Sequence, residues 1–280
     1  MSSLKEVKRR IISVENTRKI TLARKMISSA KLHRYQGFAE NAVKYREILY
    51  SILKNVAASY NGEKDNNAGN GKVVIVVMSS NSGMCGPFNV NIIRELYKKI
   101  QELGRDNVIL FPLGKKIREE LTREGYGISG NYDDYMAEKP SIEKTDILAS
   151  VIMDLYMSGK VERVELLYYH FKNIAIQEIK QELYLPFDFT QSGDQVYDDY
   201  ILEPLAEELY ELLLSKALKF KLYSALLDNH VSEHAARTMA MQLASENAKN
   251  IITELRMAYN KLRQQNITTE LLDIVGGSFT

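Results

Sequence analysis

The sequence predicts an α/β protein in which the N- and C-terminal helices form a long antiparallel coiled coil around an inserted α/β domain. Residues 205–275 contain neither Gly nor Pro, although the 280-residue chain has 15 Gly and 5 Pro. Residues 1–59 contain only one such residue, Gly37. Between these two stretches the apolar pattern changes to alternating strands and helices. Pro removes an amide donor and Gly costs backbone entropy, so both ends are predicted to be long, continuous helices.

We expect four segments along the chain. They are an N-terminal coiled-coil helix (1–60), a linker (61–72), a globular α/β domain (73–200) and a C-terminal coiled-coil helix (201–280). The linker reads NGEKDNNAGNGK, which is rich in Gly, Asn and charge.

The N-terminal helix carries the apolar spacing of a paired helix. Leu4, Val7, Ile11 and Val14 alternate at three and four residues, which is a heptad seam. Further along, the apolar stripe drifts around the helix, as expected where its partner changes. Ser2 or Ser3 can cap the start, with Glu6 three residues after Ser3.

The middle of the chain alternates strands and helices. The apolar, β-branched run Val73–Met78 predicts a buried strand and is followed by a turn at Ser79–Gly86. The elements expected next are a helix at 89–103, a strand at 107–113, a helix at 115–124, a third strand within 125–131, a helix at 141–158 and a hairpin of 163–171 with 174–185, then a loop at 186–200. This order predicts a Rossmann-like domain with a parallel sheet and right-handed crossovers.

The C-terminal helix is the longest predicted element, at about 105 Å for 71 residues. It starts near Glu203-Pro204 and stops at Gly276-Gly277. Ser232-Glu233 could cap a second helix, but apolar periodicity through this region favours one helix. An apolar stripe must be buried, so we expect the terminal helices to pair with each other. The second helix is longer, so its tip should extend about 15–20 Å beyond its partner.

The near-neutral total charge of +1 is unevenly distributed. Residues 1–60 carry a net charge of +9, residues 61–200 carry −6 and residues 201–280 carry −2. Such asymmetry indicates either a partner surface or the solvated basic face of an exposed helix.

The candidate catalytic and cofactor motifs are weak, so we predict no catalytic residue, cofactor or metal. The Ser79–Gly86 turn lacks both the Lys of a phosphate-binding loop and the G-x-G-x-x-G pattern. Cys85, the single cysteine, has no His near it in sequence to act as a base. His230 and His234 are four residues apart but lack the H-E-x-x-H order and an evident third zinc ligand.

Nucleic-acid binding and membrane insertion are also disfavoured. The basic residues of the first helix spread around it, and aromatic residues are absent before Tyr35. The longest apolar run, Val73–Met78, is far shorter than a membrane-spanning helix. One cysteine allows no intrachain disulfide and indicates a reducing compartment. Neither a signal segment nor a transit peptide is recognisable at the N-terminus.

Three motifs resemble the γ subunit of F-type ATP synthases. Residues 2–34 are similar to its start, including Glu15-Asn16-Thr17 and Lys19-Ile20-Thr21. Residues 232–277, SEHAARTMAMQLASENAKNIITELRMAYNKLRQQNITTELLDIVGG, resemble the family's signature almost throughout. The turn Gly83-Met84-Cys85-Gly86, with Asn89 and Asn91, is similar to its central motif.

The resemblance implies a central rotor shaft without catalytic residues or bound cofactor. Its partners would be three α and three β subunits around the coiled coil, with the ε subunit and the membrane c-ring at the globular domain. Proton flow through the c-ring would turn the shaft, which would drive the catalytic β subunits through their conformations for ATP synthesis. With no presequence, the cytoplasmic face of a bacterial inner membrane is favoured over a mitochondrion or plastid.

The resemblance also assigns residues to partner contacts. Polar contacts to the β and α subunits would come from Arg237, Arg263, Gln264, Thr268, Glu270 and Cys85. An apolar bearing tip would be formed by Leu271, Leu272, Ile274 and Val275. The alternative for each polar residue is simple solvation on a helix surface.

Two other functions remain open from the sequence. The first is an α/β nucleotide-binding enzyme that dimerises through helical arms, for which the isolated chain should bind nucleotide at micromolar concentration. The second is a coiled-coil tether at a membrane surface, which should not co-purify with α and β subunits in fixed proportion.

Overall fold

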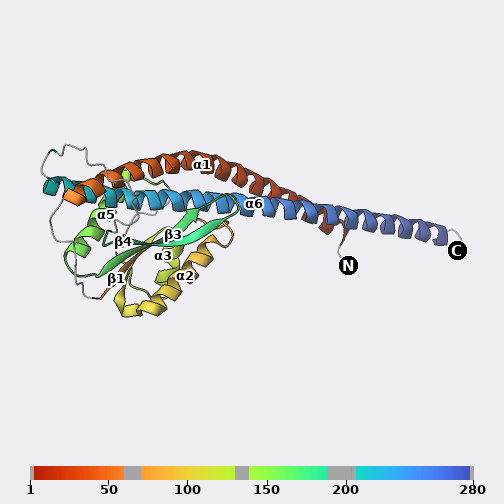
Figure 1. Ribbon diagram of the computed structural model, residues 1–280. Coiled ribbons are helices and arrows are strands. Elements are labelled where there is room, and N and C mark those ends of the chain that lie inside the picture. The colour runs from red at the N-terminus through yellow and green to blue at the C-terminus, as the bar shows by residue number, and fades with distance from the viewer. Residues whose placement is uncertain (1–2, 60–70, 130–138, 188–202, 204–205, 278–280) are drawn as a thin grey trace. The chain divides into compact units, whose positions relative to one another are not determined.

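The computed structural model describes residues 3–59, 71–129, 139–187, 203 and 206–277 (Figure 1). Contacts divide the chain into two units, each described by itself. The helical unit comprises Met1–Ser29 and Arg237–Thr280, and the sheet unit comprises Ala30–Ala236. Most of the predicted linker and the predicted loop at 186–200 lie outside the described residues. The four-segment division given above stays a prediction.

Two long helices begin and end the described chain, as predicted. Helix α1 is Leu4–Ser59 and helix α6 is Ala206–Gly277. The 72 residues of α6 correspond to about 108 Å of helix. The helix continues through Ser232, so the possible break there does not occur. The predicted N-terminal cap of α1 is also present, because the Glu6 amide donates to Ser3 Oγ at 3.3 Å.

The helical unit confirms that the two ends of the chain pair. Val7 of α1 and Met241, Ala248 and Ile252 of α6 are buried. Between the two helices, Arg256 Nη2 lies 2.8 Å from Glu15 Oε1. This exposed ion pair contributes at most about 1 kcal/mol, so burial of the apolar seam stabilises the pairing more.

Four strands form one mixed sheet within the described part of the sheet unit. The strands are β1 (Val73–Met78), β2 (Val108–Leu113), β3 (Arg163–Phe171) and β4 (Gln177–Leu185). Their order is β2-β1-β3-β4, with β1 parallel to β2 and β3, and with β4 antiparallel to β3. The predicted strands and hairpin are therefore confirmed. The third strand expected within 125–131 is reduced, among described residues, to a bridge between Leu110 and Ile128.

Helices cover both faces of this sheet (Figure 1). On one face lie α2 (Phe88–Leu103) and α3 (Lys115–Arg123), and on the other lie α5 (Ile142–Met157) and α6. A short 3-10 turn, Arg105–Asn107, precedes β2. Burial on both faces explains the uninterrupted apolar sequence of β1.

Substituting Gly114 is expected to destabilise the sheet unit strongly. This residue links β2 to α3 with φ of +110°, and an added Cβ would lie 2.4 Å from the Ser79 carbonyl oxygen. Backbone strain and overpacking together should make Gly114→Ala cost about 3 kcal/mol or more of unfolding free energy, measured by urea denaturation. Gly127→Ala is the control, because its Cβ would meet no atom within 4 Å. Equal stability of the two variants would contradict this expectation.

Candidate partner-binding surfaces

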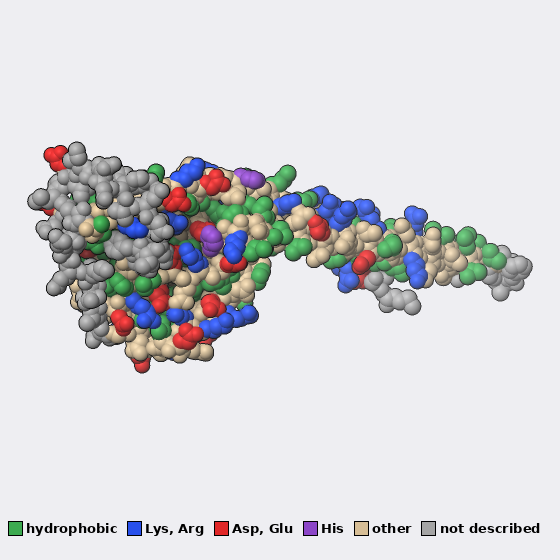
Figure 2. Space-filling view, viewed as in Figure 1, with side chains coloured by type: hydrophobic (Ala, Val, Ile, Leu, Met, Phe, Trp, Pro, Cys, Tyr) green, Lys and Arg blue, Asp and Glu red, His purple; other side chains and the backbone are tan. Residues whose placement is uncertain are grey.

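The most exposed part of the helical unit is the C-terminal end of α6. We call residues 263–275 the α6 tip. Every side chain described in the tip is exposed. Its large apolar side chains have exposed fractions of 57% (Leu271), 66% (Leu272), 69% (Ile274) and 52% (Val275). In Figure 2 this end of the molecule shows hydrophobic side chains at its surface. Adjacent exposed apolar side chains of this size are typical of a surface that a partner covers.

Helical geometry distributes the predicted tip residues over two sides. At about 100° per residue, Gln264, Thr268, Leu271, Leu272 and Val275 fall within a sector of about 100°. A second sector, about 40° wide, holds Arg263, Glu270 and Ile274. The Thr268 hydroxyl donates to the Gln264 carbonyl oxygen at 2.9 Å, within the helix. The tip therefore presents polar and apolar groups on both sides, as a contact enclosed by partners would require.

Arg237 and Cys85 are not part of the α6 tip. Arg237 precedes Arg263 by 26 residues of α6, or about 39 Å of helix, and its exposed fraction is 7%. Cys85 belongs to the sheet unit and is only 1% exposed. Arg263, Gln264, Thr268 and Glu270 thus belong to one stretch of α6 that does not include these two residues. A partner role for all six residues stays a prediction.

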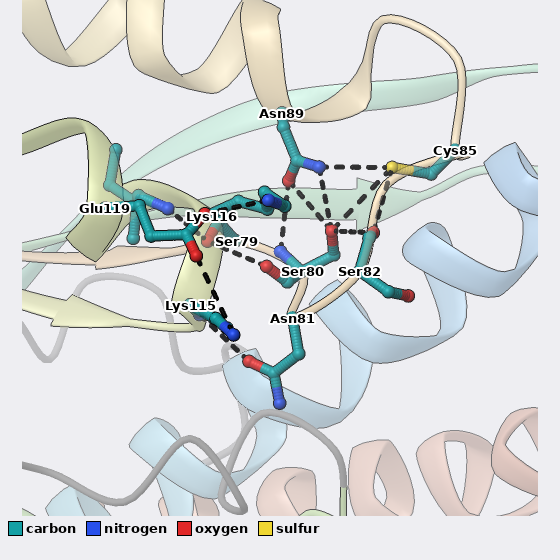
Figure 3. Close-up of polar contacts among 10 residues, drawn as sticks. Ser79, Ser80, Asn81, Ser82, Cys85, Asn89, Lys115, Lys116 and Glu119 are labelled. Atoms are coloured by element: carbon teal, nitrogen blue, oxygen red, sulfur yellow. Dashed lines mark hydrogen bonds and ion pairs between the residues drawn. The ribbon is translucent and has the colours of Figure 1, made fainter.

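The Cys85 turn is held by a local polar network (Figure 3). Asn89 Nδ2 donates to Ser80 Oγ at 2.8 Å and to Cys85 Sγ at 3.3 Å. The Ser80 amide donates to Asn89 Oδ1, and the Ser80 hydroxyl donates to the Ser82 carbonyl oxygen. These contacts explain why Asn89 accompanies the turn in sequence: its amide group closes the loop from the first turn of α2.

The same turn also occupies the N-terminus of α3. The Ile117 amide donates to Ser79 Oγ at 3.1 Å and the Lys115 amide donates to Asn81 Oδ1 at 2.9 Å. The Lys116 amide donates to the Ser80 carbonyl oxygen at 3.1 Å. These are the amides that would bind a phosphate at a helix N-terminus. Because the turn already bonds these three amides, they are not free to bind a phosphate at the N-terminus of α3.

The two histidines of α6 lie in an aromatic cluster of the sheet unit. His230 and His234 are both buried, with ring centroids 4.6 Å apart. The Tyr35 ring of α1 packs edge-on against His230 at 4.3 Å and stacks near His234 at 6.3 Å. Among the described residues, no group of three or more His, Cys, Asp or Glu side chains has a metal-binding arrangement.

A second set of exposed apolar residues lies on α1 of the helical unit, where the apolar stripe was expected to drift toward another partner. Ile20, Met26 and Ile27 have exposed fractions of 58%, 74% and 60%. The drift of the apolar stripe along α1 was the available signal, because it takes these side chains off the seam with α6. Large apolar groups left uncovered in this way indicate a further partner surface.

Sequence reasoning missed a buried charged network on β4 and α6. Glu182 accepts hydrogen bonds from Tyr168 Oη at 2.7 Å and Lys180 Nζ at 2.9 Å, and Lys221 Nζ lies 3.3 Å away. Burial by itself raises the pKa of Glu182, but Lys221, Lys180 and the Tyr168 hydroxyl together lower it to about 2. Burial lowers the pKa of Lys221, with Glu182 opposing that change. The carboxylate is therefore held ionised inside the sheet unit.

Comparison with known proteins identifies the family. A family model described as ATP synthase matches residues 3–279. The ATP synthase gamma chain of Bacteroides fragilis is 45% identical, with 99% of each chain covered. The ATP synthase gamma chain of Cytophaga hutchinsonii is 38% identical, covering 99% of this chain and 98% of that one.

A solved structure shares the fold. The rotor of Euglena gracilis mitochondrial ATP synthase has a TM-score of 0.61 at 19% identity, with 94% of this chain and 98% of that chain covered.

Within the described residues, no helix is both long and apolar enough to span a bilayer. The sequence identity over almost the whole chain shows that this protein belongs to the ATP synthase gamma chain family.

Proposed function

We propose that this chain is the central rotor shaft of an ATP synthase. It couples proton flow through a membrane c-ring to conformational cycling of the catalytic β subunits, and it performs no chemistry itself. The observation that carries the proposal is the helical unit, in which the two ends of one chain pair and α6 continues into an exposed tip.

The charge and exposure of the helical unit support enclosure by partner subunits. Its sequence contains 13 Lys and Arg residues against 6 Asp and Glu residues, a net charge of +7. Exposed apolar side chains lie on both of its helices, including Met26 and Met257 at 74% and 61%. A basic surface interspersed with apolar groups suits transient contacts with several acidic faces in turn.

We assign the polar contacts with the β and α subunits to Arg237, Arg263, Gln264, Thr268 and Glu270, together with Cys85. Charge-assisted bonds from the two arginines would form and break at each step. The apolar tip residues Leu271, Leu272, Ile274 and Val275 would rotate within the ring of partner subunits. Apolar contact is non-directional, so it would not hold the tip in one orientation.

The sheet unit would face the ε subunit and the c-ring. On this assignment the chain acts as a peripheral subunit at the cytoplasmic face of a bacterial inner membrane. Its relatives in Bacteroides and Cytophaga support the bacterial assignment.

Purification of the native complex tests this function. Mass spectrometry of the intact assembly should find one copy of this chain for three α and three β subunits. Vesicles reconstituted with the complex should pump protons on ATP addition, and complexes assembled without this chain should not. Recovery without α and β subunits, together with micromolar nucleotide binding by the isolated chain, would favour the helical-arm enzyme instead.

A further inference from the structure

The backbone of β3 continues past the end of its neighbour β1. The last paired residues of these strands are Val77 and Leu167, whereas β3 extends to Phe171. On this open side, side chains of α6 replace the missing strand. The Phe171 amide donates to Asp228 Oδ1 at 2.8 Å and the Tyr169 amide donates to Asn229 Oδ1 at 3.1 Å. The Ser232 hydroxyl donates to the Tyr169 carbonyl oxygen at 3.2 Å.

The same face of α6 is bonded to β4 further toward its N-terminus. Lys221 Nζ donates to the Leu183 carbonyl oxygen at 2.6 Å and lies 3.3 Å from Glu182 Oε1. The Tyr184 hydroxyl donates to the Leu218 carbonyl oxygen at 3.0 Å. The neighbouring strands β3 and β4 are thus both hydrogen-bonded to α6.

These contacts occupy one narrow strip of α6. Residues 218, 221, 228, 229 and 232 fall within a sector of about 100° and extend over about 21 Å of helix. All but Leu218 contribute through their side chains. Buried apolar residues of the same helix, such as Leu222 and Leu226, lie beside this strip.

The chemistry of the strip differs from ordinary helix-on-sheet packing. Apolar contact is non-directional, so it opposes separation of two elements more than rotation or sliding of one along the other. A hydrogen bond weakens steeply when its angle changes, so bonds placed off the helix axis oppose both movements. The bonds of Lys221, Asp228, Asn229 and Ser232 join side chains of α6 to backbone atoms of β3 and β4, which cannot reorient without disrupting the sheet.

Resting on the rotor function proposed above, we propose that Lys221, Asp228, Asn229 and Ser232 form a torque-bearing joint between α6 and the sheet. We call these residues and their partners on β3 and β4 the α6–sheet joint. They are positioning residues, which fix the rotational register of α6 on the sheet. Torque applied to the sheet unit then enters α6 without slip.

Asp228 is the most informative position for a test. Its two oxygens contact the Phe171 amide and His170 Nδ1, the latter at 2.6 Å. Removing a hydrogen bond to a charged group should raise the opening equilibrium of the joint by about 10- to 100-fold. Asp228→Ala removes both contacts, whereas Asp228→Asn retains an acceptor for the amide and a polar group for His170.

The test uses the complete ATP synthase complex in vesicles, with protons pumped per ATP hydrolysed as the readout. In the Asp228→Ala complex we expect ATP hydrolysis to continue while this ratio falls by about twofold or more. The reason is that torque would then populate a state in which α6 has rotated relative to the sheet. The Asp228→Asn complex should behave as wild type. Leu226→Ala is the stability control, since it removes a buried apolar side chain from the same helix without removing a joint contact.

A lowered ratio confined to Asp228→Ala supports the α6–sheet joint. An equal loss in Leu226→Ala overturns it, because general loosening would then explain the result. If the Asp228→Ala complex does not assemble, Ser232→Ala serves instead and should give a smaller loss in the same direction. An unchanged ratio in the variant that assembles overturns the joint while leaving the rotor function intact. A wild-type complex that hydrolyses ATP without pumping overturns both proposals.

Discussion

Deleting residues 265–280 is expected to abolish most ATP-driven proton pumping while leaving the sheet unit folded. The deleted residues that the structure describes are exposed, so their removal takes away little buried surface from this chain. The unfolding free energy of the remainder should change by less than about 1 kcal/mol. The functional loss should be large, because the deletion removes the apolar groups Leu271, Leu272, Ile274 and Val275 through which the tip would be held.

Two measurements check this deletion. Urea denaturation of the isolated chain reports folding, and acidification of vesicles holding the complex reports pumping. A shorter deletion of residues 276–280, which keeps the whole α6 tip, is the matched control and should pump as wild type. Loss of all soluble folding on the longer deletion would contradict the division into two units, and full pumping would contradict the role of the tip.

Substituting Lys221 by Met is expected to give the largest loss of stability. The change leaves Glu182 buried without its partner on α6, with Lys180 and Tyr168 still in contact with the carboxylate. Removal of one member of a buried ion pair costs about 3–5 kcal/mol. Urea denaturation at neutral pH measures this loss. The double variant Glu182→Gln/Lys221→Met should recover part of it, because no isolated charge is then left buried.

Acid should remove the same stabilisation from the wild-type chain. The pKa of Glu182 is about 2 in the folded protein, against an ordinary value of 4.5. A carboxyl group whose pKa is lowered on folding stabilises the folded protein at pH values above its unfolded-state pKa. This stabilisation is lost as the pH falls through the folded-state pKa. Glu182 should thus contribute about 3 kcal/mol above pH 4.5, declining toward pH 2.

The comparison of wild type with Glu182→Gln isolates this acid dependence. Their difference in unfolding free energy should be large at neutral pH and shrink between about pH 4.5 and 2. The exposed Glu119 is the control: Lys116 lowers its pKa, but solvent screens the pair, so Glu119→Gln should change stability little at any pH. A pH-independent difference for Glu182→Gln would show that the carboxylate is not held ionised by its neighbours.

The long helices and the succession of strands and helices along the chain were predictable because their signals are local, whereas the order β2-β1-β3-β4 within the sheet was not predicted. Gly and Pro interrupt a helix through their own backbone chemistry, so a run without them predicts continuity directly. The Ser3–Glu6 cap and the buried β1 run are local patterns of the same kind. Ser232 shows the limit of such patterns, since the sequence offered it as a possible helix cap. In the structure its hydroxyl instead bonds Tyr169, 63 residues earlier.

The contacts that attach α6 to the sheet could not be read from the sequence. Asp228 and Asn229 bond backbone atoms 57 and 60 residues away, and nothing in their own neighbourhood distinguishes them from solvated polar residues. The burial of Arg237 likewise depends on neighbours that only the folded chain supplies. The role of the tip residues was assigned by resemblance and stays a prediction, whereas their exposure follows from the greater length of α6.

Rotation is the property that tests the account most directly. A probe attached to the sheet unit of this chain should be followed in single complexes whose α and β subunits are fixed to a surface. During ATP hydrolysis we predict that the probe turns continuously in one direction, driven through α6. A probe that stays still while the same complexes hydrolyse ATP at the normal rate would contradict a rotor shaft.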